Sequence, residues 1–240
     1  MNKNIEGVGE VETPSTPKEK LQNFWYHYKW HSLVAVVVII ATLVCSFQFC
    51  GRTKYDAYIL YAGSKNIGRT ASDGDVAEIS TVISSMKRFA KDFDGNGSVN
   101  VNFTNYYYLS ADEAKGNEVN DALLASDTKA LSSVLEHSDY YLMFISPTVY
   151  EKYHKVGNGE LFIDINNYIY HNTDAVYYAP NAIRLSSLDA YKLPGLAVLP
   201  EDTLICIRYP SSIGGKSKEH KQHFENAKEM LVNILEINID

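Results

Sequence analysis

The stretch DFDGNGSVNVNF, which begins at Asp92, holds the residues of this chain that best fit metal chemistry. A calcium loop of the EF-hand type needs oxygen ligands at its first, third and fifth positions and a bidentate carboxylate at its twelfth. The first three of these positions hold Asp92, Asp94 and Asn96, and a glycine follows as the pattern requires. The twelfth position is Phe103, so a calcium ion would need a further carboxylate from elsewhere in the chain.

The same stretch also fits a turn that ends a helix and leads into a strand. Gly95 and Gly97 can adopt positive φ angles, and Asp and Asn side chains accept hydrogen bonds from nearby backbone N–H groups. We favour the turn because half of the calcium pattern is missing, and a turn needs no cofactor. Calcium is the alternative, with Asp92, Asp94 and Asn96 as its ligands.

Other patterns point less clearly to chemistry. The sequence over residues 214–217, GGKS, has the setting of a phosphate loop, but Pro210 stands where that motif needs glycine. His220 and His223 are one helical turn apart and could share a metal ion, yet no third ligand is evident. Ser146 lacks the glycine-flanked setting of a hydrolase nucleophile. The sequence therefore predicts a protein that is not an enzyme.

A long apolar segment covers residues 33–50, LVAVVVIIATLVCSFQFC, and carries no formal charge. As a helix it would be about 27 Å long, close to the roughly 30 Å of a bilayer core. Residues 33–41 are apolar on every face, whereas the surface helix of a soluble domain is apolar on one face. We therefore expect one transmembrane helix and the lipid bilayer as a partner.

The flanks of this segment indicate how it sits in a membrane. The sequence FWYHYKWH over residues 24–31 carries amphipathic rings that suit the headgroup layer. The residues before Cys50 are bulky and do not form a signal-peptidase site, so the segment is expected to stay as an anchor. The basic residues weakly favour a cytoplasmic N-terminus. The expected parts are a flexible cytoplasmic tail (1–23), the interfacial and transmembrane segment (24–50) and an extracytoplasmic domain (51–240).

The net charge of the chain lies entirely in residues 51–240. The net charge is −7, and within residues 1–50 four lysines cancel four glutamates. An acidic domain repels the phosphates of nucleic acids. We therefore expect no nucleic-acid partner.

Strand patterns and helix patterns alternate through residues 51–240. Strands are expected over residues 55–62, 99–109, 140–145 and 202–209, with a hairpin over 175–185. Helices are expected over residues 73–90, 117–137, 146–153 and 218–236, while 161–169 is ambiguous. This alternation predicts an α/β domain with a mainly parallel sheet covered by helices on both faces.

Sheets of this kind bind ligands where loops leave the carboxyl ends of the strands. The loops after two of the expected strands hold Ser64 with Asn66, and Ser146 with Thr148. Tyr150 follows the second loop at the start of a helix. We expect these five residues to contact a ligand.

A resemblance supports this expectation. Residues 138–169, SDYYLMFISPTVYEKYHKVGNGELFIDINNYI, resemble a pattern in extracellular solute-binding proteins of the two-lobed periplasmic type. In that pattern a strand ends in a small polar residue, and a helix, a Gly-rich turn and an apolar segment follow. The anchor is similar to that of uncharacterised single-pass membrane proteins of Firmicutes. The resemblance implies a domain like one lobe of a solute-binding protein, because the residues after the anchor leave room for one lobe.

The expected function is that of a non-enzymatic, membrane-anchored extracytoplasmic domain. It would bind a small solute or another membrane protein through the strand-end loops. The alternative is a structural or accessory ectodomain of a membrane complex with no small-molecule pocket. The chain has 18 tyrosines, and the exposed ones would then make contacts with partners.

Overall fold

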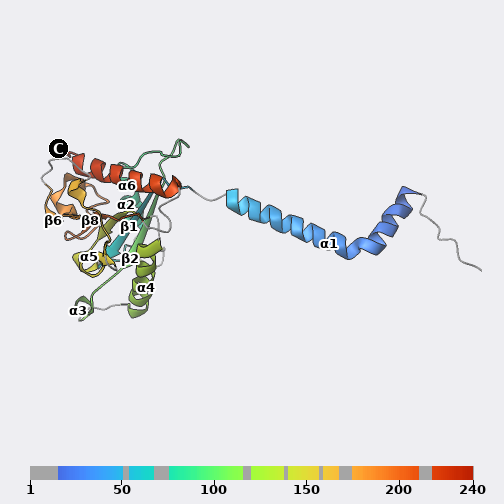
Figure 1. Ribbon diagram of the computed structural model, residues 1–240, viewed down its shortest axis with the longest axis horizontal. Helices are drawn as coiled ribbons and strands as arrows, with labels where there is room; N and C mark the ends of the chain where they lie inside the picture. The colour runs from blue at the N-terminus through green and yellow to red at the C-terminus, as the bar shows by residue number, and fades with distance from the viewer. Residues whose placement is uncertain are drawn as a thin grey trace, which may run out of the picture. The chain divides into compact units, whose positions relative to one another are not determined.

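The computed structural model describes residues 16–50, 54–67, 76–115, 120–137, 140–156, 159–167, 175–210 and 218–239. The chain divides into two compact units, Met1–Thr53 and Lys54–Asp240. Figure 1 shows the long helix of the first unit and the layered elements of the second.

Within its described residues, the first unit contains one helix, α1, which spans Pro17–Cys50. It begins inside the stretch that we predicted as a flexible tail, so that prediction is wrong from residue 17 onward. The cause is a cap: the Glu19 N–H donates to the Thr16 hydroxyl over 3.3 Å, and the Glu19 carboxylate accepts the Thr16 N–H. This reciprocal pair starts a helix, and Pro17 suits its first turn. Residues 1–15 of the predicted tail lie outside the described residues.

Helix α1 is long and apolar enough to cross a membrane. The candidate span covers Pro17–Ser46, with a mean hydropathy of 1.9 over its most apolar window, and none of that window is buried. A core helix of a soluble protein would bury such residues against its neighbours. This agrees with a single membrane-spanning anchor.

The second unit is built on a six-stranded sheet in the order β2-β1-β3-β8-β7-β6. Its strands are β1 (Ala57–Gly63), β2 (Val101–Tyr107), β3 (Leu142–Ile145), β6 (Tyr177–Ala179), β7 (Ala182–Arg184) and β8 (Leu204–Ile207). A separate pair, β4 (Lys155–Val156) and β5 (Gly159–Glu160), is antiparallel.

The sheet is parallel in one half and antiparallel in the other, so the prediction of a mainly parallel sheet is confirmed only for its core. Strand β1 pairs in parallel with both β2 and β3, as the alternating pattern predicts. The pairs β3-β8, β8-β7 and β7-β6 are antiparallel. Parallel neighbours need a long crossover, usually a helix, whereas β6 and β7 form the predicted hairpin and β7 reaches β8 through short 3₁₀ turns.

Helices cover both faces of this sheet, as predicted (Figure 1). The helices of the second unit are α2 (Val76–Met86), α3 (Ala111–Ala114), α4 (Asp121–His137), α5 (Pro147–Tyr153) and α6 (Lys218–Glu236), with 3₁₀ turns η1 (Ile165–Asn167), η2 (Leu185–Ser187) and η3 (Asp189–Lys192). One buried cluster joins α2 and α6 to Ile59 and Tyr61 of β1. A second cluster joins α4 and α5 to Leu60 and Ala62 of the same strand. Alternate residues of one strand thus fill two cores.

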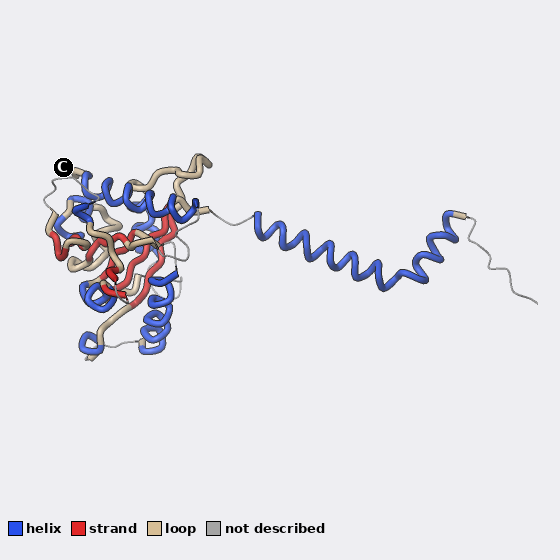
Figure 2. Tube along the Cα trace, viewed as in Figure 1, coloured by secondary structure: helices blue, strands red, loops and turns tan. Residues whose placement is uncertain are grey.

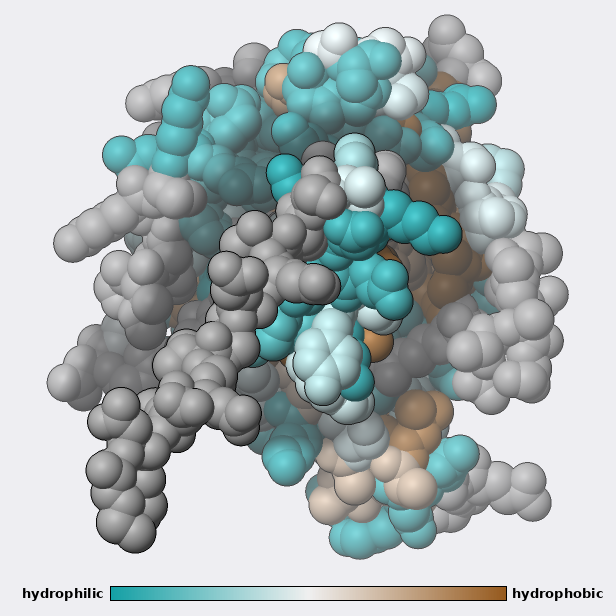
Figure 3. Space-filling view, turned by 90° about the vertical axis from the view of Figure 1, so that its right-hand side faces the viewer, coloured by the Kyte–Doolittle hydropathy of each residue, from teal (hydrophilic) through white to brown (hydrophobic). Residues whose placement is uncertain are grey.

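The described part of the ambiguous segment, residues 161–167, adds one bridge at the end of β8 and then forms a 3₁₀ turn. Phe162 makes an antiparallel bridge to Arg208, and the chain then enters η1. Figure 2 shows the loops that connect the helices and strands of the second unit. Figure 3 shows hydrophilic residues over much of the coloured surface on the side that it faces, with hydrophobic residues in places.

Candidate functional site

The carboxyl ends of β1 and β3 lie side by side and bring the predicted ligand residues together. Ser64 directly follows β1, and Ser146 directly follows β3. The Ser146 N–H donates to the Ala62 carbonyl over 2.9 Å, and a Cβ added at Gly63 would lie 3.4 Å from that of Ser146. The position of this edge agrees with the sequence prediction.

Most polar groups at this edge bond to other parts of the domain. The Ser146 hydroxyl caps α5 by accepting the Val149 N–H over 3.3 Å. The Thr148 hydroxyl donates to the Glu113 carboxylate over 2.9 Å. The Asn66 side-chain oxygen accepts the Asn105 amide over 3.1 Å. Ser64 is exposed and is therefore the predicted residue best placed to meet a partner.

Glu113 ties the start of α3 to the start of α5. It closes a capping box with Ser110 at the N-terminus of α3 and also accepts the Thr148 hydroxyl. Partial burial acts to raise the pKa of Glu113, but the hydrogen bonds from Ser110 and Thr148 outweigh it and hold the pKa below its usual value. The edge therefore presents a fixed anionic group.

Tyr150 lies in the core and holds the β6-β7 hairpin. Its hydroxyl donates to the Asn181 side chain over 2.5 Å, and its ring stacks on Phe162 with centroids 5.8 Å apart. Burial raises the pKa of this phenol to about 12, with nearby acidic groups adding to the effect. The side chain is 6% exposed, so it supports the fold and offers little surface to a ligand.

Lys65 organises the loop after β1, a role that the sequence prediction missed. Its ammonium group donates to Glu78 of α2 over 2.9 Å and to the Val198 carbonyl over 3.0 Å. Its N–H donates to the buried Tyr61 hydroxyl over 3.3 Å, and burial raises the pKa of that phenol. The described start of the loop is thus tied to α2 and to the segment around Val198.

The acidic stretch gains a third carboxylate from a distant segment. Side-chain oxygens of Asp56, Asp92 and Asp94 lie within 4.8 Å of one another. Asp56 precedes β1 and is 3% exposed, so the fold supplies the carboxylate that the calcium pattern lacked. The sequence gave no signal for this neighbour because 36 residues separate the two segments.

Hydrogen bonds account for this arrangement without an ion. Asp92 accepts the N–H groups of Gly95 and Gly97 over 2.7 Å each, and the bond from Gly97 contributes most to lowering its pKa. The two glycines have φ angles of 72° and 85°, as the turn interpretation requires. Asp56 accepts the Phe93 and Asn100 N–H groups over 2.9 and 2.7 Å. The carboxylates thus fix a turn between α2 and β2.

Replacing Asp92 and Asp94 by alanine is expected to leave the effect of calcium on melting unchanged. If calcium bound at 100 times its Kd, it would add about 2.7 kcal/mol and raise the melting temperature by roughly 5–10 °C. The test compares thermal unfolding of the full chain in calcium and in chelator. Asp112→Ala, at an exposed carboxylate on α3, is the matched control. A calcium shift in the native chain that only the double variant loses would establish a metal site.

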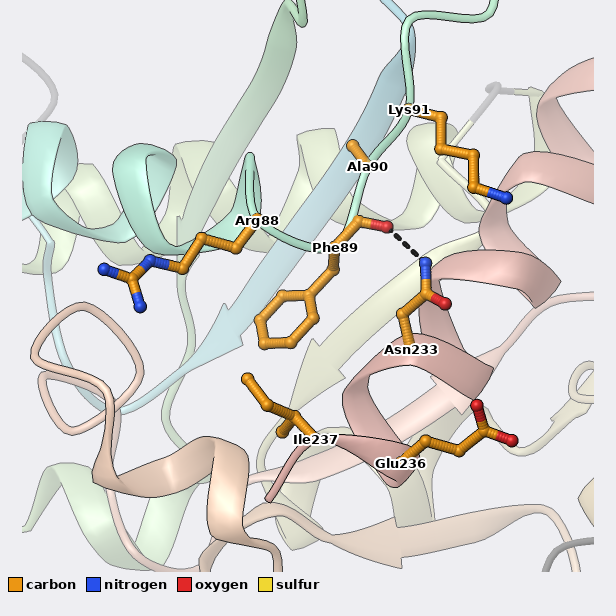
Figure 4. A pocket seen from close by; sticks show the side chains of 7 residues that line it. All are labelled: Arg88, Phe89, Ala90, Lys91, Asn233, Glu236 and Ile237. Carbon is orange, nitrogen blue, oxygen red and sulfur yellow. Dashed lines mark hydrogen bonds between the residues drawn. The ribbon is translucent and has the colours of Figure 1, made fainter. Parts of the chain in front are cut away.

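A hollow of about 370 Å³ lies elsewhere, between the end of α2 and the end of α6 (Figure 4). It is lined by Arg88, Phe89, Ala90, Lys91, Asn233, Glu236 and Ile237. The Asn233 amide donates to the Phe89 carbonyl over 2.8 Å and joins the two walls. None of the predicted ligand residues lines this hollow, and its charges have both signs.

Comparisons of the chain with protein-family models, curated proteins and solved structures found no match. The structure also shows the surroundings of Cys206 and His223. Cys206 is fully buried, and burial raises the pKa of its thiol, which opposes formation of a thiolate nucleophile. The His223 ring packs on Tyr58 with centroids 4.8 Å apart. The GGKS stretch lies outside the described residues.

Proposed function

We propose that this is a single-pass membrane protein whose α/β domain lies outside the cytoplasm and binds a partner without catalysing a reaction. The observation that carries the proposal is a 34-residue helix with an apolar window of which no part is buried, joined to a domain with its own core. Ile39 is 58% exposed and Leu43 is 53% exposed, and a bilayer would remove such side chains from water.

The resemblance to one lobe of a solute-binding protein belongs to this proposal. It is supported by the parallel core β2-β1-β3 and by the loops that leave its carboxyl edge. A two-lobed protein encloses its solute between lobes, whereas the described part of this domain is built on one six-stranded sheet, with the short pair β4-β5 beside it. We therefore propose that the edge around Ser64 and Thr148 contacts another membrane protein rather than a small solute.

The filled state of the edge favours a protein over a small solute. Ser146, Thr148 and Asn66 already bond within the domain, so the fold fixes their orientation before any solute arrives. A solute could use only the donor or acceptor capacity that these bonds leave over. A protein partner can instead cover the preformed surface, with the exposed Ser64 near its centre.

A photo-crosslinking residue in place of Ser64 is expected to form one defined protein adduct on intact cells. The same residue in place of Lys221 is the matched control, because Lys221 is exposed on α6 and none of the predicted ligand residues lies on that helix. Melting of the full chain is measured in parallel with amino acids, sugars and short peptides. Stabilisation by one of these solutes, with no adduct at position 64, would replace the protein partner by a solute.

A further inference from the structure

Asn96 and Gly97, in the acidic turn of residues 92–98, form a dipeptide whose two residues can react with each other. An asparagine side chain loses its amide as ammonia when the backbone nitrogen of the next residue attacks the amide carbon. A glycine at that next position leaves the nitrogen unhindered, because it has no Cβ. Both residues are exposed, and the structure shows what holds each of the two groups that would react.

The side chain of Asn96 is held in an activated state by Ser98. Its amide oxygen accepts the Ser98 N–H over 2.9 Å and the Ser98 hydroxyl over 2.6 Å. Two donors on one carbonyl oxygen stabilise the oxyanion that forms when a nucleophile attacks the carbon. The bond from the Ser98 N–H closes an Asx turn whose ring contains the Gly97 nitrogen. The fold thus keeps the reacting atoms within one small ring.

The nitrogen of Gly97 is held in an unreactive state by Asp92. Its N–H donates to the Asp92 carboxylate over 2.7 Å. This bond contributes most to the lowered pKa of Asp92, so the carboxyl group is ionised at neutral pH. The nitrogen must lose its proton to attack, and a carboxylate at this distance strengthens the N–H contact and repels the anion that would result. Asp92 therefore opposes the reaction for which Ser98 prepares Asn96.

Asp94 provides a comparison within the same turn. Its carboxylate accepts the Asn96 N–H over 3.0 Å, and that nitrogen is not the one that would attack. Asp94 has the same charge as Asp92 and is exposed. Protection of the Gly97 nitrogen by a hydrogen bond is therefore specific to Asp92 within this pair.

We propose that Asn96 is a deamidation site that Asp92 keeps closed in the folded protein. When the Gly97 N–H leaves Asp92, the Gly97 nitrogen attacks Cγ of Asn96 and forms a new N–C bond. The Cγ–Nδ2 bond breaks, and ammonia leaves with the proton that the Gly97 nitrogen has lost. Water then opens the cyclic imide at either carbonyl and leaves aspartate or isoaspartate at position 96.

The product would mark chains in which the acidic turn has opened. Asp56, which precedes β1, bonds to the Phe93 and Asn100 N–H groups and so ties the turn to the sheet. Either product places a new negative charge beside Asp92 and Asp94, and like charges at this spacing repel. Isoaspartate also lengthens the main chain by one carbon. Deamidation therefore makes a reversible opening permanent. The site is separate from the strand-end edge, and its test does not depend on the proposed partner.

The test follows the Asn96 amide by mass spectrometry in the full chain, incubated in lipid nanodiscs at neutral pH. Asp92→Ala is expected to deamidate about tenfold faster than the native chain, which is the rate effect of losing one hydrogen bond to a charged group. Asp94→Ala is the matched control and is expected to stay within about twofold of the native rate. Asn158, which also precedes a glycine, is an internal reference and is expected to react equally in all chains.

Asp92→Asn covers the case in which alanine unfolds the turn. It keeps an oxygen that can accept the Gly97 N–H, but a neutral acceptor binds more weakly, so an increase of about threefold is expected. A native or slower rate in both Asp92 variants would overturn the proposal. Equal acceleration by Asp94→Ala would also contradict it, because the Asp94 carboxylate bonds to a different N–H.

The reaction product gives a further test of the chemistry. A cyclic imide opens to a mixture of aspartate and isoaspartate, and we expect both at position 96 in the Asp92→Ala variant. Aspartate alone would mean direct hydrolysis of the amide by water, and it would overturn the attack by the Gly97 nitrogen.

Discussion

The double substitution Ile39→Lys and Leu43→Lys is expected to release the protein from membranes. Each lysine near the centre of a spanning helix costs about 3 kcal/mol on insertion scales. Both residues are exposed in α1, and the apolar window that contains them is unburied, so no protein contact offsets this cost. The measurement is extraction of cell membranes with alkaline carbonate, followed by detection of the chain in pellet and supernatant.

Leu21→Lys provides a matched control on the same helix. Leu21 is 69% exposed and precedes the apolar segment, so a lysine there can reach the headgroup layer. This variant is expected to stay in the pellet.

Added protease should also remove a C-terminal tag from intact cells carrying the native chain. Equal retention of the double variant and the native chain, or a protected C-terminal tag, would contradict the proposed anchor and its orientation.

Local spacing was enough to predict most helices and strands of the domain. Helix α6 has the predicted bounds, and α4 and β2 lie within theirs. These segments carry apolar residues at helical or alternating spacing, which depends on neighbours within one or two turns. The β6-β7 hairpin was predicted for the same reason, since Pro180 and Asn181 form its turn.

Contacts between distant segments could not be predicted from spacing. The sequence DTLICIRY places Arg208 at the end of a strand, where an exposed charge would be expected. The structure buries it to 1% exposure, and its guanidinium donates to the Leu135 carbonyl near the end of α4 over 2.8 Å. A helix C-terminus carries partial negative charge and stabilises such a cation. The position of α4 decides this contact, and 73 residues separate the two groups.

The candidate sites show the same difference between local patterns and contacts of distant segments. The sequence could place Ser64 and Ser146 at the ends of strands, because each directly follows a strand pattern. It could not show that Thr148 bonds to Glu113, or that Asp56 joins the acidic turn. Each of those contacts depends on how loops from separate strands meet, which no local pattern records.

Gly195→Ala is expected to destabilise the domain by about 2–4 kcal/mol, because Gly195 packs closely against α2, which is distant in the sequence. A Cβ at this position would overlap the Thr81 carbonyl oxygen of α2 and lie 2.5 Å from the Ser85 hydroxyl. The Gly195 N–H also donates to that hydroxyl over 3.1 Å. Overpacking costs about 1–3 kcal/mol and loss of a buried hydrogen bond adds about 1 kcal/mol.

The measurement is thermal unfolding of the full chain, where this loss corresponds to a fall of roughly 5–15 °C. Gly159→Ala is the control, because an added Cβ there has no atom within 4 Å, and it is expected to change stability by less than about 0.5 kcal/mol. The backbone oxygen of Thr81 is the nearest atom to the added methyl group, and the helix holds it in place. Ser85→Ala should therefore fail to rescue the Gly195 variant. Full rescue would mean that the hydroxyl, rather than the helix backbone, sets the limit on this close approach.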